Sequence, residues 1–210
     1  EITSIDYLVP GDPSSAAFLI AIGLLKSKKV VIKNVLLNER RIGFLKVLKR
    51  MNADILLENI ENFQNEPVGD IVVKKSKLQG VTIDGSDVVD MVDEVPIFTL
   101  LASQAEGVTK VIGAQELRVK ESDRLAAMEN FINELDGEIT TFEDGFEING
   151  KQNLQSGVVE TLEDHRIAMT AVVANICIDS QIKADNIDCI SDSYPDFFYD
   201  LEKIGANYES

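Results

Sequence analysis

The chain has 210 residues, of which 45% are hydrophobic and 27% charged, and its 20 Lys and Arg against 36 Asp and Glu give a formal net charge of −16. This length and apolar fraction fit one large or two small globular domains, and they argue against a disordered chain, which would lack the apolar surface for a core. The acidic balance argues against nucleic acids and anionic membranes as partners, because both bind clustered Lys and Arg.

The apolar segments are too short to cross a membrane. The longest covers residues 16–25, whereas a span needs roughly 18 apolar residues. Cys177 and Cys189 lack CxxC spacing, so neither a disulfide framework nor a zinc site is indicated. We therefore expect a cytoplasmic protein.

The chain begins without Met and without the pattern of a signal peptide, and its first residues lie part way into an expected strand. We therefore also expect it to be a domain of a longer polypeptide.

The first elements form a unit of approximately residues 1–78, which opens an internal repeat. Residues 14–25 are apolar on most faces and predict a buried helix. A strand is expected at residues 30–35 and a further strand at residues 70–73. The polar stretch at residues 61–67 is expected to be a loop inside this unit.

The second unit, approximately residues 79–150, repeats this order. An apolar helix is expected at residues 97–105, a strand at residues 108–112 and another strand at residues 145–148. Between these strands, residues 124–135 predict an amphipathic helix. Its apolar residues recur at helical spacing: Leu125, Met128, Phe131, Ile132 and Leu135.

The third unit covers approximately residues 151–210, with an apolar helix at residues 165–177 and a strand at residues 181–184. In each unit a helix ends at a similar turn followed by an expected short strand; these turns lie at residues 51–55, 135–139 and 204–208. We therefore predict one α/β (α+β) domain over residues 1–210, built from three pseudo-symmetric βαβαβ(β) units. The three apolar helices are expected to pack together at its centre.

Each apolar helix begins near an aspartate. Asp12 is expected to cap the first helix, with Pro13 at the first helical position. Asp93 and Asp164 occupy the corresponding places, and capping is the plain interpretation for them too. The only histidine, His165, is followed by Arg166 at the start of the third apolar helix. The helix dipole disfavours cations at this end of a helix. A bound anion would offset that penalty.

The densest basic cluster precedes the amphipathic helix of the second unit and contains Arg118, Lys120 and Arg124. If residues 118–121 are extended, the first two side chains project to one side, while Arg124 lies in the first helical turn. Such a segment can present cations and helix N–H groups to a phosphate or carboxylate, with Glu121 beside them as acid or base.

The alternative for this cluster is a solvated charge run, which is the common use of such segments. In that case Ser122 or Asp123 would cap the helix that follows. Composition and spacing leave both interpretations open.

Five motifs resemble the 5-enolpyruvylshikimate-3-phosphate synthase family of enolpyruvyl transferases. In family order they are VPGDPSSAAF at residues 9–18, MVDEVPI at 91–97, ELRVKESDRL at 116–125, DHRIAM at 164–169 and SYPDFF at 193–198. RVKESDR and DHRIAM together are highly specific, and the motifs extend over essentially the whole chain. The resemblance implies a fold of two similar lobes, each made of three βαβαββ units. This chain resembles the C-terminal lobe, and the N-terminal lobe is absent from it.

The resemblance also implies a reaction. The family transfers the enolpyruvyl group of phosphoenolpyruvate to the 5-hydroxyl of shikimate 3-phosphate and releases phosphate, in the shikimate pathway to chorismate and the aromatic amino acids. It implies no metal and no organic cofactor. The implied partners are the two substrates and the N-terminal lobe of the same polypeptide, in a monomer. Because this chain would hold half of the active site, we expect it to be inactive alone.

The motifs carry the family's functional residues onto this sequence. Asp93 matches the carboxylate that contacts the shikimate hydroxyls and accepts a proton, and Glu121 matches the carboxylate that protonates the phosphoenolpyruvate methylene. Lys120 matches a lysine that bridges the substrates. The matching residues with a substrate-binding role are Asp93, Lys120, Arg124, His165 and Arg166. Asp192 departs from the lysine that many members have there, so it is left out of the site.

Two other interpretations stay open. One is a sister transferase that acts on UDP-N-acetylglucosamine, which shares the architecture but lacks RVKESDR with DHRIAM as written here. The other is a non-catalytic lobe that binds substrate or complements a second lobe, since half of a cleft cannot surround its substrates.

Overall fold

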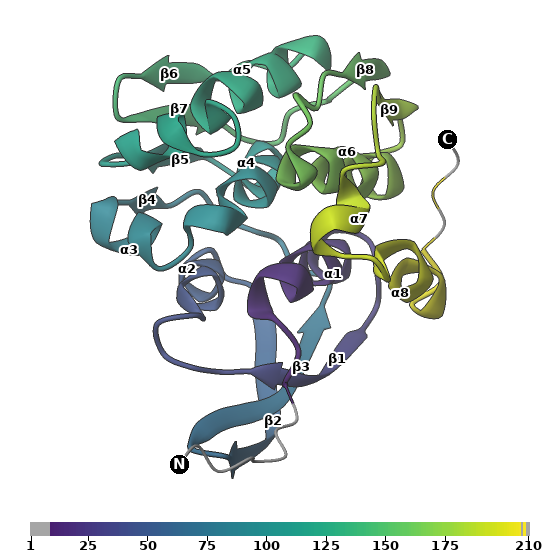
Figure 1. The fold of residues 1–210 in the computed structure, drawn as a ribbon. Helices are drawn as coiled ribbons and strands as arrows, with labels where there is room; N and C mark the ends of the chain where they lie inside the picture. The colour runs from purple at the N-terminus through teal and green to yellow at the C-terminus, as the bar shows by residue number, and fades with distance from the viewer. Residues whose placement is uncertain (1–8, 207, 209–210) are drawn as a thin grey trace, which may run out of the picture.

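The computed structural model describes residues 9–206 and residue 208, and Figure 1 shows their arrangement. The first unit contains α1 (Pro13–Leu25), β1 (Val30–Leu36), α2 (Gly43–Arg50), β2 (Asp54–Phe63) and β3 (Glu66–Lys74). The second contains β4 (Thr82–Ile83), α3 (Gly85–Val89), the 3₁₀ helix η1 (Val92–Glu94), α4 (Val95–Gln104), β5 (Val108–Val111), the 3₁₀ helix η2 (Gln115–Val119), α5 (Arg124–Glu134), β6 (Thr140–Phe142) and β7 (Gly145–Asn149). The third contains β8 (Gly157–Val159), α6 (His165–Cys177), β9 (Ile182–Ala184), α7 (Ile190–Ser193) and α8 (Phe197–Lys203).

The strand pairing confirms the predicted repeat. In the second unit the sheet order is β4-β5-β7-β6, with β4 parallel to β5 and the other pairs antiparallel. The first unit has the same order, because a parallel bridge from Gly11 to Val35 precedes β1-β3-β2. In the third unit β8 again pairs in parallel with β9. In each unit, the apolar helix thus lies in the connection that joins two parallel, paired strands.

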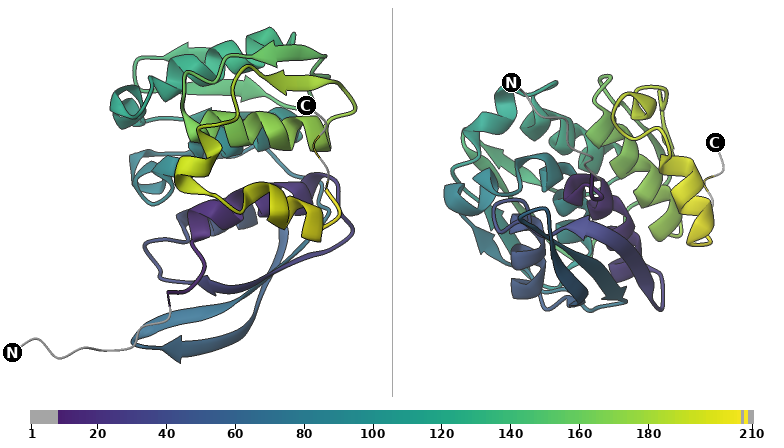
Figure 2. Two further views of the ribbon diagram at one scale, coloured as in Figure 1. Left: turned by 45° about the vertical axis from the view of Figure 1, so that its right-hand side comes forward. Right: turned by 60° about the horizontal axis from the view of Figure 1, so that its bottom comes forward.

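The three apolar helices form the centre of the fold, as predicted. α1, α4 and α6 contact one another, and most of their residues are buried. In Figures 1 and 2, α1 and α6 lie between the sheet of the first unit and the sheets of the other two. Because all sides of these helices meet other elements, their sequences are apolar all round rather than amphipathic.

The helix-ending turns are equivalent in the three units. Asn52, Asp136 and Gly205 follow the ends of α2, α5 and α8, and all three are left-handed, with φ of 67°, 57° and 73°. In each case the next N–H donates to the carbonyl five residues earlier, which is a Schellman cap. The repeated turn in the sequence is therefore a repeated helix cap. The strand after the second cap begins at Thr140, slightly later than expected, and part of the third segment lies outside the described residues.

The expected loop at residues 61–67 is wrong. This stretch is the tip of a β2-β3 hairpin, with Phe63 opposite Glu66 and with Gln64 and Asn65 in the turn at φ of 52° and 69°. Two consecutive left-handed residues suit a tight hairpin turn. The β2 end of the hairpin is exposed on both faces, so its sequence lacks the alternation that marks a half-buried strand.

Candidate active site

The site is built around Arg124, the first residue of α5. Asp123 caps this helix by accepting a hydrogen bond from the N–H of Ala126 at 3.1 Å, as one of the two predicted caps would. The Arg124 side chain is only 1% exposed. A buried guanidinium must be paired, because an unpaired buried charge is very costly. The partners of Arg124 therefore define the site.

Asp164 holds the inner edge of Arg124. It accepts hydrogen bonds from Nε of Arg124 at 2.9 Å and from Nη2 at 3.4 Å, and its side chain is fully buried. The same carboxylate caps α6 through the N–H of Arg166 at 2.9 Å and accepts the Ser122 hydroxyl at 3.0 Å. Burial alone would raise the pKa of Asp164, but the hydrogen bond and charge of Arg124 outweigh it and hold that pKa below its usual value.

Two half-exposed carboxylates hold the outer edge of Arg124. Nη1 donates to Asp93 at 3.0 Å, and Nη2 donates to Glu121 at 2.7 Å. Arg166 adds a longer contact from its Nη2 to Asp93, at 3.8 Å. The two carboxylates proposed for acid-base work therefore lie on one guanidinium, although Asp93 is in η1 and Glu121 precedes α5.

The charges of the cluster reinforce one another. Burial would raise the pKa of Asp93, but the hydrogen bond from Arg124 and the charges of Arg166, Arg124 and Lys120 lower it below the usual value. Burial would lower the pKa of Arg124, and the hydrogen bond and charge of Asp164 instead raise it. Asp93 and Asp164 are therefore ionised near neutral pH, and Arg124 keeps its positive charge.

His165 and Lys120 lie at the edge of this cluster. Burial, together with the charge of Arg166, lowers the pKa of His165, so its imidazole is neutral near pH 7 and can both donate and accept hydrogen bonds. Lys120 forms no ion pair with the described residues. It lines a cavity of about 240 Å³ together with Val88, Val89, Val92, Gly113 and Glu116.

Arg118 does not belong to the cluster. Residues 118–121 are not extended, because Gln115–Val119 form η2, and the predicted projection of Arg118 beside Lys120 is wrong. Instead Arg118 pairs with Asp123 at 2.9 Å and donates to the carbonyls of Phe142 and Glu143. These carbonyls lie at the β6-β7 turn, so Arg118 ties η2 to that hairpin.

The aspartates at the helix starts have different roles. Asp12 caps α1 as predicted, accepting from the N–H of Ser15 at 2.8 Å, and it pairs with Arg41. Asp164 also caps a helix, whereas Asp93 lies in η1 and points its carboxylate at Arg124. The anchoring of Arg124 by Asp164 was missed, because 40 residues separate them and no spacing rule connects such positions.

Glu94 was also missed. It is 5% exposed, and burial raises its pKa despite a hydrogen bond with Ser14 and the charge of Arg166. The only signal in the sequence was its position beside Asp93. Through its hydrogen bond with Ser14, Glu94 links the start of α4 to the start of α1.

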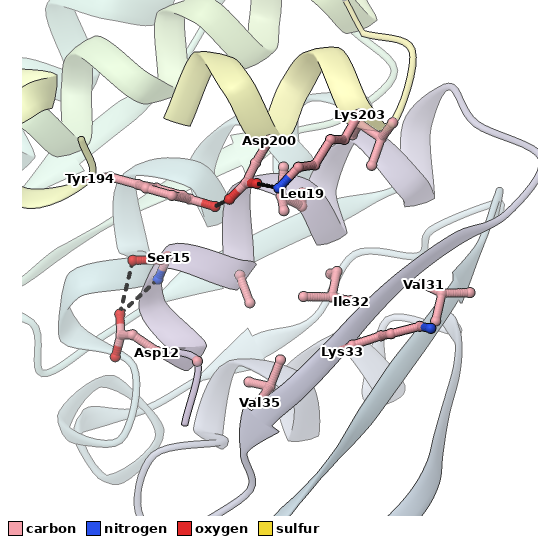
Figure 3. Close-up of a pocket in the computed structure, with 13 residues that line it drawn as sticks. Asp12, Ser15, Leu19, Val31, Ile32, Lys33, Val35, Tyr194, Asp200 and Lys203 are labelled. Atoms are coloured by element: carbon pink, nitrogen blue, oxygen red, sulfur yellow. Dashed lines mark hydrogen bonds and ion pairs between the residues drawn. The ribbon is translucent and has the colours of Figure 1, made fainter. Parts of the chain in front are cut away.

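A separate cavity of about 590 Å³ lies between α1, β1 and α8 (Figure 3). Tyr194 donates to Asp200 at 2.8 Å on one side of it, and Asp12 and Ser15 lie at the start of α1. None of the residues around Arg124 lines this cavity. The outer carboxylates of the charged cluster, Asp93 and Glu121, are instead half exposed. Within the part of the chain that the structure describes, no helix is long and apolar enough to cross a bilayer.

Comparison with known proteins agrees with the motifs. The family model of EPSP synthase (3-phosphoshikimate 1-carboxyvinyltransferase) matches residues 1–201. Proteins named 3-phosphoshikimate 1-carboxyvinyltransferase are 46% identical over 95% of this chain in Endomicrobium trichonymphae and 39% identical over 97% in Aquifex aeolicus. The matches cover 47% and 48% of those relatives, so the chain spans about half of their length.

Solved structures give the same result. The EPSP synthase of Acinetobacter baumannii superimposes with a TM-score of 0.91 at 34% identity, covering 96% of this chain and 47% of that one. The enolpyruvyl transferase NikO of Streptomyces tendae shares the fold, with a TM-score of 0.73 at 16% identity over 93% of this chain and 43% of that one. The chain belongs to the EPSP synthase family.

Proposed function

We propose that the full-length protein containing this chain transfers the enolpyruvyl group of phosphoenolpyruvate to the 5-hydroxyl of shikimate 3-phosphate and releases phosphate. The observation that carries this proposal is the arrangement at Arg124, where two solvent-accessible carboxylates surround a guanidinium that a buried carboxylate fixes in place. The substrates are inferred from family membership. The cluster contains the carboxylates and cations that this reaction requires.

The cations of the site would bind the anionic substrates. Arg124 and Arg166 bind the carboxylate and phosphate of phosphoenolpyruvate, and Lys120 bridges the two substrates. His165, neutral near pH 7, adds a hydrogen bond. One feature of the structure supports anion binding by Arg166. This residue follows the Asp164 cap at the start of α6, where the helix N–H groups also favour an anion. These fields act at short range, so the acidic net charge of the chain does not prevent anion binding.

The two outer carboxylates would move the protons. Asp93 accepts the proton of the 5-hydroxyl as its oxygen attacks C2 of phosphoenolpyruvate, and Glu121 donates a proton to the C3 methylene. The tetrahedral intermediate then loses phosphate, which takes up the proton held by Asp93. A proton leaves C3 for Glu121, and this restores the double bond and both carboxyl groups to their starting states. Both carboxylates are about half exposed, at 42% and 50%, so substrate can reach them.

We infer that an N-terminal lobe completes the site and that the chain alone binds shikimate 3-phosphate weakly without turnover. The lengths of the relatives support this, since the chain covers less than half of the relative from Endomicrobium trichonymphae, at 47%. We also propose a monomer in the cytoplasm. The unpaired thiols of Cys177 and Cys189 support a reducing compartment.

The test is phosphate release by the full-length protein with both substrates present. Glu121→Gln and Asp93→Asn are expected to lower turnover by about 10²–10⁴-fold with the fold intact. The matched controls are Glu202→Gln and Asp179→Asn, which change exposed carboxylates outside the site and should keep normal turnover. Near-normal turnover of both site variants, or phosphate release with UDP-N-acetylglucosamine in place of shikimate 3-phosphate, would overturn the proposal.

A further inference from the structure

The connection between β8 and α6 contains an unusual turn. The N–H of Asp164 donates to the carbonyl of Thr161 at 2.9 Å and closes this turn. The two residues between them, Leu162 and Glu163, are both left-handed, with φ of 54° and 57°. Such turns normally contain glycine, asparagine or aspartate, because larger side chains crowd the backbone in this conformation. Leu162 is the one apolar residue among the non-glycine residues of positive φ in the described part of the chain. The turn is therefore strained, and contacts outside it must hold it.

Asp185, directly after β9, holds the first residue of this turn. Its Oδ1 accepts the N–H of Thr161 at 2.9 Å and the hydroxyl of the same residue at 2.7 Å. Thr161 is fully buried, so both of these donors need a partner within the protein. Slight burial would raise the pKa of Asp185, but the hydrogen bonds from Thr161 outweigh it and keep that pKa below its usual value. The residue before the turn is fixed as well, since the N–H of Glu160 donates to Glu134 of α5 at 3.2 Å.

The turn ends at Asp164, the buried carboxylate on which the site is built. Oδ2 of Asp164 accepts Ser122 and Arg124, and Oδ1 accepts the N–H of Arg166. A change of φ within the turn would move the backbone of Asp164, and with it every group that this carboxylate holds. The hydrogen bonds of Asp185 go to the turn rather than to the charged cluster, so Asp185 can influence the cluster only through the backbone.

We propose that Asp185 is a positioning residue for the two arginines that bind phosphoenolpyruvate. Its hydrogen bonds keep residues 162–163 in the left-handed conformation, and this conformation fixes Asp164 where it can hold both Arg124 and the start of α6. The strain of the turn is thus offset by a carboxylate that lies outside the charged cluster. This inference rests on the proposed function, which assigns Arg124 and Arg166 to phosphoenolpyruvate.

The test is steady-state kinetics of the full-length protein, with phosphate release measured at varied concentrations of each substrate. Asp185→Ala should lower kcat/KM for phosphoenolpyruvate by about 10–10²-fold, because misplaced arginines bind this substrate less well. The KM for shikimate 3-phosphate should change less, since neither Asp93 nor Lys120 belongs to the turn. Thr161→Val removes one of the two hydrogen bonds and keeps the side-chain shape, so it should give a smaller loss of the same kind. Asp188→Ala removes an exposed carboxylate from the same connection and is the matched control.

A second pair of substitutions separates positioning from a general loss of structure. Leu162→Asn combined with Glu163→Gly gives the sequence that most readily adopts two left-handed residues in a row. Both native side chains are exposed, so little packing is lost. In this background the turn no longer needs Asp185. Asp185→Ala should then lower kcat/KM for phosphoenolpyruvate by less than about three-fold, which is a clear departure from additivity.

Three results would overturn the inference and leave the proposed function intact. The first is a kcat/KM for phosphoenolpyruvate within about two-fold of wild type in both Asp185→Ala and Thr161→Val. The second is an equal loss from Asp185→Ala with the native turn and with the substituted turn. The third is an equal rise in the KM of both substrates. If Asp185→Ala does not fold, Thr161→Val decides by the same measurements. Absence of turnover in the wild type would instead overturn the proposed function, and this inference with it.

Discussion

The hydroxyl of Ser122 donates to Oδ2 of Asp164 at 3.0 Å, the same oxygen that accepts Nε of Arg124 at 2.9 Å. One buried carboxylate oxygen thus fixes both the residue before the α5 cap and the guanidinium of its first turn. Since Asp164 also caps α6, the starts of two helices from different units are joined at one side chain. The placement of Arg124 beside Asp93 and Glu121 depends on this junction.

Asp164→Asn is expected to destabilise the protein by about 3–5 kcal/mol, because it leaves the buried Arg124 without its main counter-charge. The folded pKa of Asp164 is depressed, so its contribution is present above the unfolded value of about 3.9 and is lost as the pH falls through the lower folded pKa. Urea unfolding at neutral and acid pH measures this. The difference between wild type and variant should shrink at acid pH. Asp179→Asn, an exposed carboxylate, is the control and should show no loss.

Ser122→Ala should weaken the positioning of Arg124 without removing a charge. We expect a loss of about 1 kcal/mol in unfolding free energy, since one hydrogen bond to a buried carboxylate is lost. Turnover should fall through kcat, because a displaced guanidinium would also misplace Glu121. Ser122→Thr keeps the hydroxyl and should restore both quantities. A threonine variant as impaired as the alanine variant would show that the hydroxyl is not responsible.

Much of the fold could be predicted because it repeats. The apolar helix at residues 165–177 agrees with α6 residue for residue, and the turn at Asn52 recurs as the same left-handed cap in the other units. The hairpin tip at residues 61–67 could not be predicted, because strands exposed on both faces carry no alternating pattern. Hydrophobic patterning indicates which residues are buried. It therefore gives no signal for an exposed strand end, such as that of β2, whose backbone pairs with a neighbouring strand.

The site could be predicted only in part. Spacing and motif identified Asp93, Glu121 and Arg124, and the structure brings these side chains together. Arg118 lies in the same basic run, but it turns away because η2 replaces the expected extended segment. Asp164 could be recognised as a cap from local sequence, whereas its ion pair depends on how two units pack. Contacts between units have no local signal in a single sequence.

Glu94→Gln is expected to stabilise the protein near neutral pH. Burial raises the folded pKa of Glu94 above its unfolded value of about 4.3, so the wild type loses stability as the pH rises between those two values. Glutamine keeps the shape and cannot ionise, so it removes this loss. Melting temperatures between about pH 4 and pH 8 should diverge with rising pH, in favour of the variant. Parallel curves for the two proteins would contradict this account, and Glu202→Gln gives the baseline for an exposed carboxylate.

Arg118→Gln separates the structural arginine of the basic run from the arginines of the site. Because Arg118 donates to the carbonyls of Phe142 and Glu143 and pairs with Asp123, we expect a loss of about 1–2 kcal/mol in unfolding free energy. The turnover of the folded protein should stay within about two-fold of wild type, since Arg118 does not contact the carboxylates around Arg124. Arg166→Gln is the matched comparison, and we expect it to lower turnover by about 10²-fold or more with little change in stability. The two arginines are told apart by measuring urea unfolding and phosphate release on the same preparations. A large loss of turnover in Arg118→Gln, with an unchanged free energy of unfolding, would show that Arg118 takes part in the site.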